Sequence, residues 1–187
     1  STQSRSSAAS DVYKRQTEVC AGVSTESQPV QAVNFNCPGQ TVIAGAAGAV
    51  EKACAALKEA GAKRAIMLNV SAPFHSSLME PAAQKLKKVL DKIEIKDAEI
   101  PVIANVNALA ETKAADIRTH LVEQAAHAVR WEESMRNLIA GGMDTMVECG
   151  PGTVLSGFMR KIDKSIVSYH AENIETIIET VQALKGV

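Results

Sequence analysis

The chain has 187 residues, 46% of them apolar, which fits one globular domain or a domain with a small lobe. Twenty basic residues against twenty-one acidic ones give a net charge of −1, and aromatic residues make up 3%, so no basic face or stacking platform for nucleic acid is expected. The longest apolar run, residues 42–50, is too short to span a bilayer.

Residues 1–16 differ in composition from the rest of the chain. They are rich in serine, show no apolar period and do not begin with Met. Residues 6–16 also resemble translated adapter sequence of the kind found at the ends of fragmentary reads. We therefore predict that residues 1–16 form a disordered, non-native tail, and that the true protein begins further upstream.

The remaining sequence alternates between strand-like and helix-like segments. Strands are predicted near residues 30–35, 41–44, 64–70, 100–106, 143–148 and 165–168. Apolar stripes predict helices near residues 50–57, 78–92, 117–125, 135–139, 155–162 and 174–184. Asn173 is expected to cap the last helix, and Ser77 the helix that begins at Leu78. The alternation predicts an α/β fold with a largely parallel sheet.

The segment from residue 30 to residue 70 stands apart within this order. Its first two strands are separated by Pro38-Gly39, a turn signal, and a helix and a third strand follow. This pattern predicts a small α+β lobe of ferredoxin-like type that lacks its first elements.

His75 is the residue with the clearest catalytic potential. It lies in a loop, residues 71–77, directly before a helix, and imidazole is a suitable general base because it titrates near neutral pH. The plain alternative is a surface or helix-capping histidine. The sequence contains no Gly-x-Ser-x-Gly nucleophile elbow and no phosphate-binding glycine loop. Its four cysteines lack metal-ligand spacing, which indicates buried thiols in a reducing cytosol and no metal site.

Five segments resemble, in order and spacing, the malonyl-CoA:acyl carrier protein transacylases. They cover residues from about 19 to the C-terminus, and together they form a specific match. The segments are Val33–Gly45, Gly61–Met79 (which contains Ser71-Ala72-Pro73-Phe74-His75-Ser76), Ile100–Val106, Val129-Arg130-Trp131 and Glu148–Leu155.

The resemblance implies part of an α/β-hydrolase-like acyltransferase core with an incomplete ferredoxin-like lobe. Residues 17–70 would be the remnant of that lobe, and residues 71–187 the C-terminal part of the large subdomain. The implied enzyme is an [acyl-carrier-protein] S-malonyltransferase of fatty acid biosynthesis. It would take malonyl-CoA and the phosphopantetheine arm of acyl carrier protein as partners, in the cytoplasm, without cofactor, metal, nucleic acid or membrane.

The family mechanism is a two-step transfer. A serine attacks the malonyl thioester, a histidine takes its proton, and the pantetheine thiol then accepts the malonyl group. By position, His75 resembles the catalytic base, and Phe74 the residue linked to selecting malonyl over branched acyl groups. The backbone carbonyl of Arg130 would orient the histidine.

Three further residues are assigned by the resemblance to substrate binding. Asn105 would lie near the histidine. Asn36 and Gln40 would lie on the small lobe beside the pantetheine channel.

The chain departs from the family in what precedes the lobe. The nucleophile elbow, the oxyanion loop and the malonate-binding arginine come earlier in the family, and this sequence holds none of them. We therefore expect a C-terminal fragment that is inactive by itself. Two alternatives remain: an acyltransferase domain fragment of a polyketide synthase, or a non-catalytic interaction module in which His75 has no role.

Overall fold

The computed structural model describes the backbone of residues 2–186 and the side chains of residues 12–186. It divides into two compact units, the first ending at Trp131 and the second beginning at Glu132. Helices and strands occur together in both units, as the α/β expectation requires.

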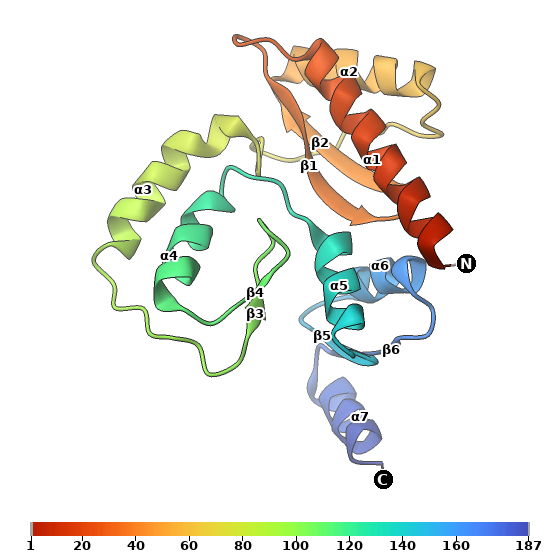
Figure 1. Cartoon of the computed structure of the whole chain (residues 1–187), viewed down its shortest axis with the longest axis vertical. Coiled ribbons are helices and arrows are strands. Elements are labelled where there is room, and N and C mark those ends of the chain that lie inside the picture. Colours follow the sequence, from red (N-terminus) through yellow and green to blue (C-terminus); the bar gives the residue numbers. More distant parts are fainter. Residues whose placement is uncertain (1, 187) are drawn as a thin grey trace. The chain divides into compact units, whose positions relative to one another are not determined.

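The N-terminal part of the first unit is a β-hairpin covered by two helices, one before it and one after it in the chain (Figure 1). Strand β1 (Val30–Cys37) pairs antiparallel with β2 (Gln40–Gly45). The connecting turn is Pro38-Gly39, and Gly39 has a φ of +81°, a conformation that glycine adopts without strain. Helices α1 (Thr2–Val23) and α2 (Ala47–Glu59) contact the hairpin and each other. Their shared core is built on Val30, Ala49 and Ala53.

The prediction of a disordered tail over residues 1–16 is wrong for residues 2–16, which form most of α1. Two contacts join this part of the helix to the hairpin. The Tyr13 ring meets the Phe35 ring edge-on, with centroids 5.0 Å apart, and the Thr41 hydroxyl donates a hydrogen bond to the Gln16 amide oxygen. A serine-rich composition does not forbid a helix when tertiary contacts support it. That residues 1–16 are non-native stays a prediction.

The strand predicted over residues 64–70 is also wrong. The chain there has no regular structure, the Val70 amide donates to the Leu68 carbonyl over 3.1 Å, and Ile66, Met67, Leu68 and Val70 are each more than half exposed. Strand formation depends on a neighbouring edge that accepts and donates backbone hydrogen bonds, and no described strand pairs with this segment.

The rest of the first unit is mainly helical. A short 3-10 turn, η1 (Ser77–Met79), leads into α3 (Glu80–Leu90), and two-residue strands β3 (Val102–Ile103) and β4 (Ala110–Glu111) form an antiparallel pair before α4 (Ala114–Glu123). The Arg118 side chain joins α4 to the end of α3 by donating to the carbonyls of Leu90 and Ile93. The prediction that Ser77 caps a helix is wrong, because Ser77 is the first residue of η1. Ser76 occupies the capping position and makes no side-chain capping bond.

One backbone contact links the hairpin to the end of the first unit. The Phe35 amide donates to the Val129 carbonyl over 2.9 Å, and the Val129 amide donates to the Val33 carbonyl over 2.8 Å. Residues on both sides of the boundary expected between 70 and 71 therefore lie in one unit. The division between units falls after Trp131 instead.

The second unit begins within α5 (Trp131–Ala140), and a strand–helix–strand–helix segment follows this helix (Figure 1). Strand β5 (Thr145–Cys149) pairs parallel with β6 (Val167–Ala171), and α6 (Val154–Ile162) is the crossover between them. Helix α7 (Ile174–Lys185) ends the unit. Asn173 caps α7 as predicted, since its side chain accepts from the Thr176 amide over 3.0 Å.

The expectation of a largely parallel sheet is not met. Residues 2–186 contain three two-stranded sheets, and β5–β6 is the parallel one. Parallel strands need long crossovers and further neighbours, which alternation along the sequence does not by itself supply. Among the described helices, none is long and apolar enough to cross a membrane.

Glu148 joins β5 to the start of α6. Its carboxylate accepts from the amides of Leu155 and Ser156 over 2.9 and 2.8 Å, and from the Ser156 hydroxyl over 2.7 Å. Burial acts to raise the pKa of this carboxyl. The bonds from Ser156 and Leu155, with the charge of His170, outweigh burial and hold the pKa below its ordinary 4.5.

This lowered pKa predicts a specific acid sensitivity. A carboxylate with a depressed folded pKa stabilises the fold above its unfolded pKa, and loses that contribution as pH falls through the folded value. We expect the native chain to lose more stability than Glu148→Gln between about pH 6 and about pH 3. Urea unfolding across this range measures the difference. Glu179→Gln, on the exposed surface of α7, is the control and should lose as much stability as the native chain. The prediction is contradicted if the unfolding free energy of the native chain falls with pH no more steeply than that of Glu148→Gln.

The cysteines give a second prediction. All four are free in the structure, Cys20 is buried and Cys149 is exposed. Burial, and the neighbouring Cys54 thiol, raise the pKa of Cys20 to about 11. Because the thiolate is the reactive form, iodoacetamide at about pH 8 should alkylate Cys149 well before Cys20. Peptide mass spectrometry over time would show this order, and equal rates in the folded chain would refute it.

Candidate active site

His75 is held in a short, tightly bonded loop of the first unit. The Ser76 hydroxyl, which is buried, donates to the Pro73 carbonyl over 2.7 Å. The Ser77 amide donates to the Gln31 side-chain oxygen on β1, also over 2.7 Å. His75 itself has a φ of +62°, an uncommon conformation for a residue with a side chain. These contacts hold the loop on both sides of a locally strained histidine.

The imidazole of His75 is fixed by one hydrogen bond. Its Nδ1 lies 2.8 Å from the backbone carbonyl oxygen of Gln124, directly after α4. A carbonyl oxygen can only accept, so Nδ1 must carry the proton. In the neutral ring, Nε2 then has a free lone pair, which is the arrangement that a general base requires.

Gln124 is positioned in turn by a pair of side chains. The backbone amide of Gln124 donates to the backbone carbonyl of His120 over 2.9 Å, in the last turn of α4. The His120 Nδ1 is paired with the Glu111 carboxylate on β4, and the His120 Nε2 lies 3.4 Å from the Asn107 side-chain nitrogen. The Glu111–His120 pair therefore attaches the end of α4 to β4, at the place where the His75 partner is presented.

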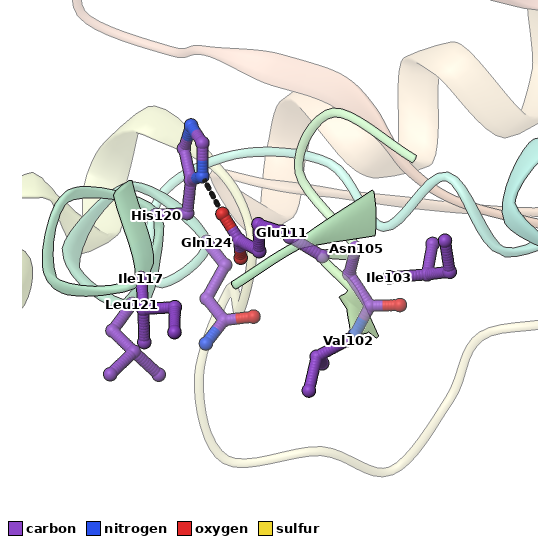
Figure 2. A pocket seen from close by; sticks show the side chains of 9 residues that line it. Val102, Ile103, Asn105, Glu111, Ile117, His120, Leu121 and Gln124 are labelled. Atoms are coloured by element: carbon purple, nitrogen blue, oxygen red, sulfur yellow. Dashed lines mark hydrogen bonds and ion pairs between the residues drawn. The ribbon is translucent and has the colours of Figure 1, made fainter. Parts of the chain in front are cut away.

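A cavity of about 190 Å³ lies beside this pair, between β3, β4 and α4. Figure 2 shows the Gln124 side chain between Ile117 and Leu121 on one side and Val102 and Asn105 on the other, with His120 directed toward Glu111. The walls are mostly apolar, and the polar groups are few. Small-molecule sites commonly have this composition.

The residues assigned beside His75 are only partly brought together. Asn105 lines the same cavity as Gln124, so it shares a site with the residue that holds His75. Phe74 is half exposed and does not line that cavity. The structure differs from the expectation for Arg130: the carbonyl at Nδ1 is that of Gln124, six residues earlier. The Arg130 amide instead donates to the Asn105 carbonyl over 2.9 Å.

Asn36 and Gln40 lie at the turn end of the β1–β2 hairpin. The Gln40 side-chain oxygen faces the Cys37 thiol at 3.6 Å, and neither Asn36 nor Gln40 lines the cavity beside Gln124. Their proposed contact with a pantetheine arm stays a prediction. In the part of the chain that the structure describes, no three His, Cys, Asp or Glu side chains gather as a metal site would require.

Sequence reasoning missed Gln124, Glu111 and His120. Gln124 contributes a backbone atom, so its residue type carried no signal. Glu111 and His120 are nine positions apart on a strand and a helix, and nothing in the sequence marked them as a pair, because the burial of Glu111 is apparent only in the fold.

Comparison with known families finds one match over nearly the whole chain. The acyl transferase domain family matches residues 5–182. A malonyl CoA-acyl carrier protein transacylase of Bacillus subtilis (strain 168) is 51% identical over 168 residues, which are 90% of this chain and 53% of the relative. A Haemophilus influenzae protein of the same name is 50% identical over 137 residues, 73% of this chain and 44% of that protein. The chain spans about half the length of the curated relatives it matches.

Solved structures give the same result. An acyl-carrier-protein S-malonyltransferase from Burkholderia pseudomallei 1710b has a TM-score of 0.86 at 41% identity, covering 90% of this chain and 55% of its own. A second match, with a TM-score of 0.85 at 41% identity, covers 92% of this chain and 54% of its own. It is described as a type II polyketide acyl-carrier protein in complex with its malonyl-transacylase.

The His75 contact predicts a defined tautomer. Neutral His75 should carry its proton on Nδ1, because the Gln124 carbonyl accepts it. Long-range ¹H–¹⁵N NMR correlations distinguish the two tautomers. Replacing Glu111 with Ala should release the end of α4 and lower the Nδ1–H to Nε2–H ratio by about 2- to 10-fold, the range expected for one hydrogen bond.

Glu123→Gln is the matched control, since Glu123 is an exposed acid in the last turn of α4, the turn that also holds His120. Its tautomer ratio should equal that of the unmodified chain. A ratio that Glu111→Ala leaves unchanged would show that the Glu111–His120 pair does not position the Gln124 carbonyl.

Proposed function

Because this chain belongs to the acyl transferase domain family, we propose that it forms the histidine-bearing part of a malonyl-CoA:acyl carrier protein transacylase. The complete enzyme transfers a malonyl group from malonyl-CoA to the phosphopantetheine thiol of acyl carrier protein. The observation that carries the proposal is the Nδ1 contact of His75 with a backbone carbonyl, which leaves Nε2 able to accept a proton. Half-identical relatives of that name support it.

In the proposed first step, His75 acts through Nε2. It takes the proton of a serine hydroxyl as the serine oxygen bonds to the malonyl thioester carbon. The carbon–sulfur bond then breaks, and the coenzyme A sulfur leaves with the proton that Nε2 returns. The printed sequence holds no Gly-His-Ser-x-Gly elbow, so this serine belongs to protein outside these 187 residues.

The second step reverses the first with another thiol. Nε2 takes the proton of the pantetheine thiol, the sulfur attacks the malonyl-serine ester, and the serine oxygen leaves with that proton. The bond to the Gln124 carbonyl serves both steps, because it stabilises the imidazolium that forms each time and keeps the ring in one orientation.

The remaining residues have binding or positioning roles in the proposal. Phe74 flanks the base and excludes an α-branched acyl group by its size. Asn105 binds substrate from the cavity wall beside Gln124. Asn36 and Gln40 line the pantetheine path. Arg130 supports the site through its backbone bond to Asn105, since Gln124 supplies the carbonyl at Nδ1.

Polyketide synthesis is a second setting for the same chemistry. One similar structure is a malonyl-transacylase bound to a type II polyketide carrier protein. The transfer step and the role of His75 are identical in both settings, and the carrier protein distinguishes them. A non-catalytic interaction module, in contrast, would not require His75.

A chimeric enzyme tests the proposal. Residues 17–187 would be joined to the part of the Bacillus subtilis relative that this chain does not match. We expect the chimera to move labelled malonyl from malonyl-CoA to acyl carrier protein. Replacing His75 with Ala should reduce the rate by about 10²- to 10⁴-fold, because general-base catalysis contributes that much.

His127→Ala is the control, since His127 is exposed and its ring contacts only the Glu123 carbonyl one turn back. Its rate should stay near that of the parent chimera. An active chimera that keeps its rate after His75→Ala would refute the assignment of the base. Circular dichroism of both variants separates loss of chemistry from loss of fold.

A further inference from the structure

The second unit has a cavity of about 360 Å³ between α6 and β6. Three of its lining residues carry or can carry positive charge: Arg160 on α6, Lys164 just after it, and His170 on β6. Four others carry hydroxyl groups, namely Thr153, Ser156, Ser168 and Tyr169, of which the Ser156 hydroxyl already donates to Glu148. The cavity is thus lined by cations and by donors of hydrogen bonds, and no carboxylate is among its lining residues.

The cations of this cavity are not used by the fold. Within the described residues, neither Arg160 nor Lys164 has an ion-pair partner or a side-chain hydrogen bond. Their placement is not explained by overall charge either, because residues 132–187 contain eight acidic and five basic residues. An acidic unit that gathers unpaired cations around one cavity has a local potential opposite to its net charge.

Ser168 supplies an independent observation. Its hydroxyl is fully shielded from solvent, lines the cavity, and has no hydrogen-bond partner in the described part of the chain. Buried hydroxyls are almost always paired, so an unpaired one next to a cavity is available to a group that binds there. A hydroxyl beside two or three cations is a donor toward an anionic oxygen.

The neighbouring acid, Glu148, does not compete for these groups. Its carboxylate already accepts three hydrogen bonds, from the amides of Leu155 and Ser156 and from the Ser156 hydroxyl. Those bonds also occupy the backbone donors of Leu155 and Ser156 at the start of α6. Arg160 and Lys164 lie about one and two turns further along the chain. The charge of His170 helps to lower the pKa of Glu148, so His170 interacts with this acid as well as lining the cavity.

We propose that this cavity is a binding site for a phosphate-type oxyanion, held by Arg160, Lys164 and His170 with the Ser168 hydroxyl as a further donor. Arginine and lysine are the usual partners of phosphoryl oxygens, Arg as a fork and Lys as a point charge. The proposed site lies in the second unit and shares no residue with the candidate active site around His75. The phosphoryl group comes either from free inorganic phosphate or from the phosphates of coenzyme A.

The test is a titration of the ¹⁵N-labelled 187-residue chain at constant ionic strength, near 0.15 M so that exposed charges are screened. One arm uses inorganic phosphate and the other coenzyme A. We expect saturable shifts of the Ser168 and His170 amides with a Kd of about 1 mM or tighter in at least one arm. A coenzyme A affinity at least about tenfold tighter identifies it as the source, and equal affinities identify free phosphate.

Variants separate a built site from general attraction. Arg160→Gln and Lys164→Gln should each weaken binding by about tenfold, as expected for a charge-assisted hydrogen bond, and Ser168→Ala should weaken it by about threefold. Lys161→Gln is the matched control, because Lys161 is exposed and adjacent but does not line the cavity. Its affinity should change by less than about twofold.

Two results would overturn the proposal. One is a titration that does not saturate with either anion in a chain whose amide spectrum is dispersed and folded. The other is equal weakening by Lys161→Gln and Lys164→Gln, which would mean that charge alone attracts the anion. Because binding is measured without acyl transfer, either result leaves the proposed role of His75 untouched.

Discussion

The hydrogen bond between the His75 Nδ1 and the Gln124 carbonyl is the contact on which the candidate active site depends. It determines which ring nitrogen carries the proton and holds a histidine whose backbone conformation is otherwise unfavourable. The contact spans 49 positions in the sequence, from the loop before η1 to the end of α4. Whatever shifts the end of α4 therefore reaches the imidazole directly, and the Glu111–His120 pair is placed to prevent such a shift.

Each unit uses backbone groups to fix an ionisable side chain. In the first, a carbonyl after a helix orients the base. In the second, amides at the start of α6 hold the Glu148 carboxylate and lower its pKa against the effect of burial. Helix ends leave such groups unsatisfied, which makes them ready partners for ionisable side chains. The fold thus supplies much of its electrostatic organisation from the main chain.

Local sequence signals predicted the structure well where the cause is local. The Asn173 cap, the Pro38-Gly39 turn and the helices before and after β5 depend on neighbours a few positions away. The strand at residues 64–70 and the largely parallel sheet failed, because strand pairing depends on edges far away in the sequence. His75 was found from its residue type and its motif. Its partner was not, since a backbone carbonyl has no signature, and the same holds for the pairing of Glu111 with His120.

The unpaired segment from Ile66 to Val70 also has a consequence for handling the molecule. Four large apolar side chains stand in a segment that pairs with no described strand, beside Asn69 as the one polar position. Such a stretch is a template for intermolecular strand pairing, as in the edge-to-edge aggregation of β-proteins. Self-association should therefore grow with protein concentration. A single lysine in place of Leu68 would act as a gatekeeper, since it introduces charge repulsion between stacked copies.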